Sequence, residues 1–470
     1  MLFLLGPMLA VQAADEPPAR KGGSRQAVQT TKCSEVPAHP LDVILGRPTS
    51  TSVTVSVLCY DAAEGCIAYG TQAGKPSIKT AVRTFQKGVP VEIVLSGLQA
   101  DTRYFYQVEL AHATRAAGSF HTARPPGGTF TFTVTADSHL DEHTEPAIYQ
   151  KTLANALADR PDFHIDLGDT FMTEKHATRE AAAQQYLAQR YYFGALCQSA
   201  PLFLAIGNHD GESPRGRGAD ADSLAVWSNT MRKRYFPGPV PDTFYTGNGT
   251  RHPDAGLLQD YYAWQWGDAL CVVLDPYWFA QKQRGKGDNW SRTLGEQQYQ
   301  WLKRTLESSR AKFKLVFIHH LVGGADEQCR GGAEAAPFYE WGGKNADGSD
   351  GFQQNRTGWP APVHSLLVSN NVSIVFHGHD HFYAKQELEG IIYQEVPQPG
   401  CPGNGNGKAP RSAAEYGYKN GDILGGSGHL RVTVAPKTLV VEYLRADLTD
   451  TAGGAGKPAG AAQRYTVPAP

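Results

Sequence analysis

The pattern of apolar residues changes at the segment ARPPGG, residues 123–128, and this change constrains the fold more than any other feature. Before it, from about Asp42 to Thr122, apolar and polar residues alternate in stretches such as TSVTVSV and PVEIVL, and no helical period intervenes. After it, strand-like runs such as TFTFTVT alternate with helix-like segments such as EPAIYQKTLANALAD. The chain is therefore expected to fold as a small antiparallel β sandwich followed by an α/β layer structure.

Length and charge set the broad class. A chain of 470 residues exceeds what one hydrophobic core usually serves, and a hydrophobic content of 41% is ample for two folded domains. We place the sandwich at residues 37–124 and the α/β domain at residues 129–448. The formal net charge of -2, with no extended basic patch, gives no reason to expect binding to a nucleic acid polymer or to an anionic membrane.

The two ends of the chain lack the pattern of a folded domain. The opening MLFLLGPMLAVQAAD places small residues after a short apolar run, so we interpret residues 1–14 as a signal peptide, although no Lys or Arg precedes the run. The run is too short to span a bilayer, and no later segment is long and apolar enough to do so. Residues 15–36 are expected to form a disordered leader and residues 449–470 a flexible tail. A secreted or periplasmic protein follows from this interpretation.

Seven cysteines lie far apart and form no CxxC pair, which argues against a zinc site built from thiolates. Export would permit disulfides, and Cys59 and Cys66, which flank a short turn between two strand-like segments, are the favoured pair. An odd total leaves at least one thiol unpaired. Cys271, inside LCVVLD, is best interpreted as a small buried hydrophobic residue.

Several segments have a structural interpretation. The stretch GEQQYQWLKRTLESSR, which begins at Gly295, predicts a helix with Tyr299, Leu302 and Leu306 on one face. The aromatic run YYAWQW is expected to form the core of a hairpin. Two Gly-rich stretches, Gly323–Gly358 and Pro397–Gly428, are expected to be surface loops that shape substrate access.

Polar residues stand at the carboxyl ends of five apolar strands. FTFTVT is followed by Asp137 and His139, FHIDL by Gly168 and Asp169, and PLFLAI by GNHD; FKLVFI is followed by His319 and His320, and VSIVF by HGHDH. Each motif alone is weak, because Asp, Asn and Gly are common in turns. Ligands bind beyond the carboxyl ends of the strands in open α/β sheets, so the shared placement predicts one site built from all five.

The order DxH, GD, GNH, H and GHxH resembles the calcineurin-like metallophosphoesterase family over roughly Thr129 to Leu448. The resemblance implies a four-layer α/β/β/α sandwich and a dinuclear metal centre. One metal would be held by Asp137, His139 and His381, the other by Asn208, His319 and His379, with Asp169 bridging the two. The resemblance also implies that His209 is a catalytic residue that contacts the substrate phosphate or protonates the leaving group.

The chemistry of these side chains agrees with such a centre. Imidazole and carboxylate suit iron, manganese or zinc, divalent or trivalent, and a shared carboxylate holds two such ions close enough to clamp the attacking and departing oxygens of phosphoryl transfer. Water on such ions loses a proton near neutral pH and becomes the nucleophile. An anionic phosphate ester would be attracted to the paired cations despite the neutral balance of the chain.

The arrangement of the two domains resembles purple acid phosphatases more narrowly. In the segment LQADTRYFYQVEL, the spacing of Leu98, Thr102, Tyr104 and Tyr106 resembles that at the corner of fibronectin type III domains. A buried Tyr at that corner has a structural role. Two positions depart from the purple group: Met172 stands where those enzymes place a Tyr that binds iron(III), and His139 has no counterpart there. We therefore expect an intact metal site without a phenolate ligand and without purple colour.

Several neighbours of the candidate ligands are given structural interpretations. Placement after the strand favours His319 over His320 as the ligand, and His164 and Asp166 are expected to be polar core residues. In the last motif His377 is interpreted as structural, and Asp380 lies between ligands without being one. Asp210 either orients a histidine or caps a helix. Solvated loop positions are expected for His176, Arg215 and Arg217.

The leading hypothesis is an exported metal-dependent hydrolase of phosphate esters, a phosphomonoesterase that acts on phosphorylated small molecules or nucleotides. The alternative with the same site is a phosphodiesterase or a nucleotidase. A non-catalytic surface binding module is disfavoured, because loss of function would be expected to erode at least one ligand. The substrate, the metals and the oligomeric state are not determined by the sequence.

Overall fold

The computed structural model describes residues 34–111, 113–140, 143–216, 218–281, 289–402, 407–446 and 460–470. The expected signal peptide at residues 1–14, residues 15–33 of the expected leader, Cys33 and Arg217 lie outside these ranges. Within the described part of the chain, no helix combines the length and the hydropathy that crossing a bilayer requires.

The amino-terminal strands form two antiparallel sheets. One has the order β1-β2-β6, and the other has the order β4-β3-β7-β8 with β5 also paired to β3. Alternate residues of β2 and β7, such as Val55 and Tyr106, point into a shared core, as the period of two predicts. The strands are β1 (Leu41–Gly46), β2 (Ser52–Cys59), β3 (Ala63–Gly70), β4 (Ile78–Lys79), β5 (Arg83–Phe85), β6 (Val91–Ser96), β7 (Arg103–Leu110) and β8 (Ala113–His121).

The tyrosines of the predicted corner have structural roles. The Tyr104 hydroxyl accepts a hydrogen bond of 2.9 Å from the backbone N–H of Gln99, which ties the corner to the preceding turn. The Tyr106 hydroxyl donates to the carbonyl of Gln198, 2.7 Å away at the end of α2 (Arg179–Cys197). Tyr106 therefore fastens the sandwich to the α/β region.

Two larger sheets follow. The first has the order β11-β10-β9-β22-β23-β24, in which β9, β10 and β11 are parallel and β22 runs antiparallel to β9. Its strands are β9 (Phe130–Thr135), β10 (Phe163–Asp166), β11 (Leu202–Leu204), β22 (Gly428–Ala435), β23 (Thr438–Arg445) and β24 (Gln463–Pro468). The parallel arrangement brings the carboxyl ends of β9, β10 and β11 to one edge.

The second large sheet has the order β12-β15-β16-β17-β18-β20-β19-β21. The strands β16, β17 and β18 are parallel neighbours, so their carboxyl ends also share one edge. Its strands are β12 (Thr246–Gly247), β15 (Tyr262–Trp266), β16 (Ala269–Val273), β17 (Phe313–Phe317), β18 (Ile374–His377), β19 (Tyr383–Leu388), β20 (Ile391–Glu395) and β21 (Asp422–Leu424). The pairing of β15 with β16 and the burial of Trp264 and Trp266 confirm the expected hairpin core.

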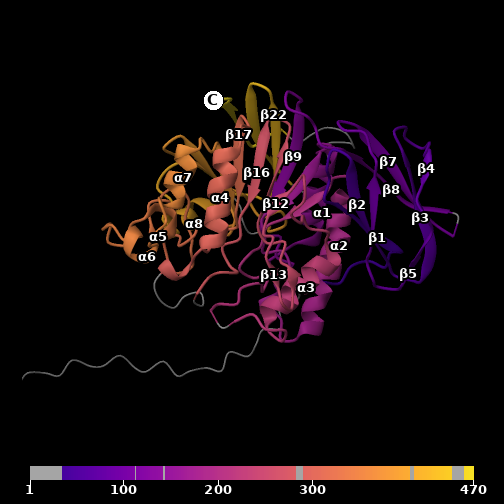
Figure 1. Cartoon of the computed structure of the whole chain (residues 1–470), viewed down its shortest axis with the longest axis horizontal. Helices are drawn as coiled ribbons and strands as arrows, with labels where there is room; N and C mark the ends of the chain where they lie inside the picture. Colours follow the sequence, from indigo (N-terminus) through magenta and orange to yellow (C-terminus); the bar gives the residue numbers. More distant parts are fainter. Residues whose placement is uncertain are drawn as a thin grey trace, which may run out of the picture. The chain divides into compact units, whose positions relative to one another are not determined.

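The two large sheets pack face to face around one apolar core, and helices cover their outer faces. The inner core joins Phe132 of β9 and Phe163 of β10 to Phe317 and Phe376 of the second sheet. The helices α1 (Pro146–Ala158) and α2 cover the first sheet, and α4 (Glu296–Ser308) and α7 (Val363–Ser369) cover the second (Figure 1). The predicted four-layer α/β/β/α sandwich and the amino-terminal β sheets are thus confirmed.

The predicted helix after Gly295 is α4, whose buried face contains Tyr299, Leu302 and Leu306, as expected. Shorter elements complete the described fold: η1 (Thr173–Lys175), α3 (Leu224–Tyr235), β13 (Arg251–His252), β14 (Gly256–Leu257), η2 (Asn289–Ser291), α5 (Tyr339–Gly342), α6 (Phe352–Asn355) and α8 (Ala409–Glu415).

The expected disulfide and part of the expected tail need correction. Cys59 and Cys66 are both free, because Cys59 points into the sandwich core while Cys66, beside the buried Ile67 on β3, lies on the opposite face near Glu109. Residues 463–468 of the expected tail form β24, which pairs with β23 and packs Tyr465 and Val467 against the inner core. Cys271 is fully buried and free, as expected for a small hydrophobic residue.

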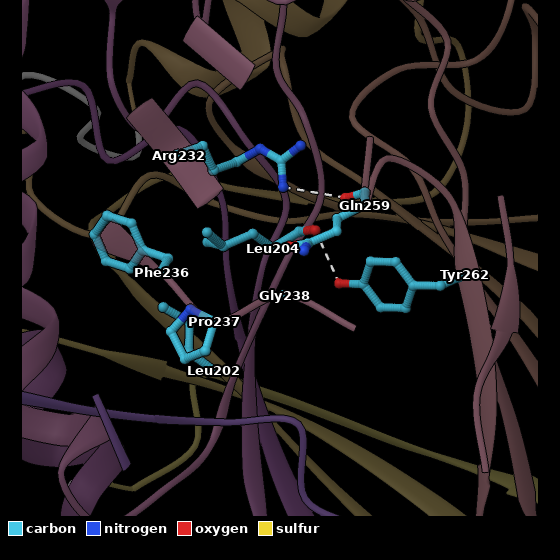
Figure 2. A pocket seen from close by; sticks show the side chains of 8 residues that line it. All are labelled: Leu202, Leu204, Arg232, Phe236, Pro237, Gly238, Gln259 and Tyr262. Atoms are coloured by element: carbon cyan, nitrogen blue, oxygen red, sulfur yellow. Dashed lines mark hydrogen bonds between the residues drawn. The ribbon is translucent and has the colours of Figure 1, made fainter. Parts of the chain in front are cut away.

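A small cavity behind β11 belongs to the packing of the fold. It holds about 10 Å³, close to the roughly 10–15 Å³ that one water needs, so it is too small for a substrate. Figure 2 shows the Tyr262 hydroxyl pointing at the carbonyl of Leu204, to which it donates at 2.9 Å, and Arg232 pointing at Gln259. The bond from Tyr262 holds the edge strand β11, which leads into the GNHD motif.

Candidate metal centre

The predicted ligands all lie just beyond the carboxyl ends of the strands. Asp137 and His139 follow β9, Asp169 follows β10 and Asn208 follows β11; His319 follows β17, and His379 and His381 follow β18. Five of these seven have a left-handed backbone conformation, with φ of 58° (Asp137), 39° (His139), 55° (Asp169), 81° (His379) and 71° (His381). Residues other than glycine adopt this conformation at a cost, and such strain gathers at functional sites.

Two glycines permit the close approach of these turns. A Cβ atom on Gly378 would lie 2.6 Å from Asp137 Oδ2, and one on Gly207 would lie 1.9 Å from the backbone nitrogen of Asp169. Both contacts are shorter than any side chain tolerates, so only glycine fits at these positions. Gly378 therefore lets turns of the two sheets meet across the edge, and Gly207 lets two neighbouring turns of the first sheet meet.

The first ligand group consists of Asp137, His139 and His381, whose ligand atoms all lie within 4.8 Å of one another. Asp137 Oδ1 lies 3.4 Å from His381 Nε2 and 3.6 Å from His139 Nε2. The other oxygen, Oδ2, accepts a hydrogen bond of 2.8 Å from the backbone N–H of His379. The carboxylate is thus fixed by the neighbouring turn while Oδ1 faces the imidazoles.

The second group consists of Asp169, His319 and His379, again within 4.8 Å. His319 Nδ1 donates to the carbonyl of Leu167 at 2.9 Å, and His379 Nε2 donates to the carbonyl of Gln328 at 2.7 Å, because a carbonyl can only accept. In its neutral form each ring therefore has a lone pair on its other nitrogen. His319 Nε2 lies 3.3 Å from Asn208 Oδ1, which brings the predicted amide ligand to the same group.

Asp169 lies between the two groups. Its Oδ2 is 3.3 Å from His139 Nε2 in the first group and 3.5 Å from His319 Nε2 in the second. Its Oδ1 accepts a hydrogen bond of 2.7 Å from the backbone N–H of His209. One buried carboxylate within reach of both groups is the geometry that a bridging ligand requires.

The charges of the site are strongly coupled. Burial would raise the pKa of Asp137, but the imidazoles of His319 and His381 hold that pKa well below its usual range. Burial likewise opposes ionisation of Asp169, and His319 and His209 nevertheless lower its pKa. Burial would lower the pKa of His319, yet Asp169 and Asp137 raise it to about 9. Burial is the dominant effect on His381, and it lowers the pKa of that residue.

These residues fit metal ions. Asp137 Oδ1 is buried and accepts no hydrogen bond from the described residues, although imidazole nitrogens lie around it at distances too long for one. A carboxylate oxygen in that position is satisfied by a cation. The donor set of carboxylate, imidazole and amide oxygen suits iron, manganese or zinc.

The His209 ring contacts the carboxylate of Glu174, a residue that the sequence did not single out. Its Nδ1 lies 2.8 Å from Glu174 Oε1, and Arg215 forms an ion pair with the other oxygen of Glu174. The Nε2 of His209 lies 3.9 Å from Asp169 Oδ2. Arg215, expected to be solvated, is instead part of this chain of contacts, because η1 brings Glu174 alongside it.

The neighbouring polar residues are placed away from the two groups. His164 contacts the hydroxyls of Thr133 and Thr135 at 2.9 and 3.0 Å, in the polar core as expected. His377 Nδ1 lies 2.7 Å from Glu395 Oε2, and His320 Nδ1 lies 3.0 Å from the carbonyl of Leu321. Neither His377 nor His320 belongs to a ligand group.

Three acidic residues accept hydrogen bonds in or near the turns that carry the candidate ligands. Asp210 accepts hydrogen bonds from the backbone N–H groups of four residues, Asp169, Thr170, Phe171 and Gly207, so it joins two ligand turns and neither orients a histidine nor caps a helix. Asp380 accepts from the N–H of Gly331 and from the hydroxyl of Tyr418. Asp166 accepts from Thr135 and Thr170 within the core.

The two groups open into a pocket of about 250 Å³. Side chains from both Gly-rich stretches, including Arg330, Cys401, Lys408 and Tyr416, line the pocket beside His139, Asp169 and His209. Lys175 and His143 also reach it. The pocket therefore carries positive side chains next to the candidate centre, as a site for an anionic substrate requires.

Comparisons with known proteins identify the family and the fold. Residues 130–383 match a protein family described as calcineurin-like phosphoesterase. The solved structure of PhoD has a TM-score of 0.65 and 17% identity, covering 93% of this chain and 91% of that chain. A purple acid phosphatase, PPD1 from yellow lupin (Lupinus luteus) seeds, has a TM-score of 0.59 and 14% identity, covering 92% and 74%. At these identities the likeness establishes a shared fold. None of the curated proteins matches the chain.

Proposed function

This chain belongs to the calcineurin-like phosphoesterase family, and from that premise we propose that it is an exported phosphomonoesterase that works with two metal ions. The observation that carries the proposal is the buried carboxylate of Asp169, which lies within 3.5 Å of imidazoles from both ligand groups. The proposal of export rests on the sequence MLFLLGPMLAVQAAD.

In this proposal Asp137, His139 and His381 hold one ion, Asn208, His319 and His379 hold the other, and Asp169 bridges them. The ions, iron, manganese or zinc, would supply the Lewis acidity that activates water and neutralises charge on the phosphoryl group. The carbonyls of Leu167 and Gln328 fix the neutral tautomers of His319 and His379, which leaves the other nitrogen of each ring to bind an ion.

His209 has the position of a proton donor. Glu174 contacts its Nδ1, and the Nε2 side is directed toward Asp169 and the pocket. A histidine oriented in this way can hold a proton on Nε2 and deliver it to the departing alkoxide, or it can donate a hydrogen bond to a phosphoryl oxygen. Glu174 fixes the orientation of the ring.

Monoesters are favoured over diesters because cationic side chains surround the centre. Lys175 and Lys408 line the pocket, and a monoester dianion gains more from this charge than a diester monoanion does. A phosphodiesterase or nucleotidase would use the same ligands. A binding module without activity would have no use for a complete ligand set.

The test measures bound metal and, in the same preparation, hydrolysis of an aryl phosphomonoester and of a bis-aryl phosphodiester. Wild type, Asp169→Ala and the control Asp254→Ala, an exposed carboxylate, are compared. The proposal predicts two ions per chain and preference for the monoester. Asp169→Ala should lose the ions and the activity, and the control should keep them. Hydrolysis of the diester alone would favour the phosphodiesterase, and absence of metal and activity under several added metals would exclude the proposed enzyme.

A further inference from the structure

Arg330 differs from Arg215 and Arg232, two other arginines of the α/β region. Arg215 pairs with Glu174, and Arg232 pairs with Glu212. For Arg330 no carboxylate lies within ion-pair distance among the residues that the structure describes, and its side chain lines the pocket of the candidate centre. The charge of Arg330 also attracts the Asp380 carboxylate, but no ion pair with a described residue engages the half-buried guanidinium, so its hydrogen-bond donors are available to a ligand.

The position of Arg330 is fixed by its surroundings. Its backbone N–H donates to Asp326 Oδ1 at 3.0 Å, its carbonyl accepts from Ala325 at 2.7 Å, and the next N–H, of Gly331, donates to Asp380 Oδ2 at 2.9 Å. The guanidinium carbon lies 4.1 Å from the centroid of the Tyr416 ring. Stacking on the ring and the bonded turn reduce the entropy that the side chain loses when it binds an anion.

The charge of the centre leaves Arg330 without a role in binding the reacting phosphate. Two divalent ions and the carboxylates of Asp137 and Asp169 leave a net charge of about plus two, which already balances a monoester dianion. The pocket of about 250 Å³ is more than ten times the roughly 10–15 Å³ that one water needs, so it has room for more than a phosphoryl group.

We propose that Arg330 binds a second anionic group of the substrate, so that this enzyme prefers phosphate esters whose alcohol part carries a carboxylate or a further phosphate. This inference rests on the proposed phosphomonoesterase function. The planar guanidinium matches either oxyanion with two parallel hydrogen bonds, and Tyr416 holds the plane in place.

The experiment uses three matched substrates: propyl phosphate, the same ester with a terminal carboxylate, and propanediol bisphosphate. Release of phosphate is measured for the metal-loaded wild type, Arg330→Gln, Arg330→Lys and the control Arg83→Gln, an exposed arginine on β5 of the sandwich. The preferred doubly anionic substrate should show kcat/KM about tenfold above propyl phosphate in wild type and in the control, as expected for one charge-assisted bidentate contact. Arg330→Gln should abolish the preference and leave propyl phosphate almost unchanged, and Arg330→Lys should keep part of it.

Binding provides a readout that does not depend on turnover. Calorimetry with propylphosphonate and with propane bisphosphonate should show about tenfold tighter binding of the second compound to wild type, and equal binding of the two compounds to Arg330→Gln. The carboxylate and phosphate substrates distinguish the two sources of the second charge. An equal loss on all three substrates in Arg330→Gln, or a preference that persists in it, would overturn the proposal. Absence of hydrolysis of every substrate, with the aryl monoester included, would instead contradict the proposed function.

Discussion

The two ligand groups are built from the same elements but differ in how firmly they are held. Each takes residues from both large sheets, so a metal ion in either would join the two sheets. The His319 side chain of the second group is fully buried, whereas 35% of the His381 side chain in the first is exposed. In the second group, both histidines also donate to backbone carbonyls that fix their tautomers.

This difference indicates that the two groups serve different purposes. The second group is buried and its rings are oriented before any ion arrives, which favours tight binding. Both groups border the pocket, but the first does so through the more exposed His381, so an ion there would be more open to substrate and to exchange. The comparison predicts unequal ions within one centre, and the following changes test it in order of decreasing effect.

The largest effect is expected where the groups meet. Asp169→Asn keeps the volume of the side chain but removes a charge from both groups, so the protein should hold fewer than one ion per chain. Activity should fall by more than the roughly hundredfold that loss of an outer partner causes. Metal analysis and hydrolysis of an aryl monoester check this. Retention of one tightly bound ion would mean that Asp169 serves a single group.

Removing one histidine from each group tests the two ions separately. His319→Ala should eliminate the tightly held ion, and His381→Ala should eliminate the exchangeable one. Dialysis of wild type against increasing chelator should therefore release the ions in two steps, and His381→Ala should show only the step at higher chelator. A single step in wild type, or the same remaining step in both variants, would contradict the inequality of the two groups.

The number of protons released on metal binding should also differ between the two groups. Without metal, the pKa of His319 is raised to about 9, so its ring is protonated at neutral pH, while burial lowers the pKa of His381 and leaves that ring neutral. An ion must displace the His319 proton, and metal affinity of the second group should fall about tenfold per unit as pH drops below 9. Calorimetry of metal-free His381→Ala in buffers of different ionisation enthalpy should detect about one proton released per ion at neutral pH. The matching experiment on His319→Ala should detect much less.

A smaller effect is expected from a change of Glu174, which contacts His209. Glu174→Gln removes a carboxylate that orients the ring, so kcat should fall by about tenfold to a hundredfold while both ions stay bound. Glu180→Gln, an exposed residue in the first turn of α2, is the control. Loss of metal in Glu174→Gln would assign it a different role.

The sequence predicted which candidate ligands lie together better than it predicted the residues around them. Strand after strand ending in Asp, Asn or His implies one shared edge, because parallel strands end together. The partners Glu174, Glu395 and Arg330 carry no such signal: each acts through a contact between segments distant in sequence or through the geometry of a loop. For the same reason the Cys59 and Cys66 pair was wrong, since spacing does not reveal which face of a strand a side chain occupies.

The smallest effect on the centre is expected from His377→Ala. Burial lowers the pKa of His377 to about 3 and raises that of Glu395, so the two form a neutral pair at neutral pH, 2.7 Å apart. Glu395 Oε1 also accepts from the backbone N–H groups of Asp380 and His381, at 3.0 and 3.2 Å. Those bonds survive the substitution, so both ions should stay bound. The free energy of unfolding should fall by about 1–3 kcal/mol, the cost of a buried polar group without its partner, and His377→Gln should restore part of it. Urea denaturation measures the free energy of unfolding, and metal analysis measures the bound ions. Loss of an ion in His377→Ala would mean that the contact between His377 and Glu395, and not the ligands alone, determines metal binding.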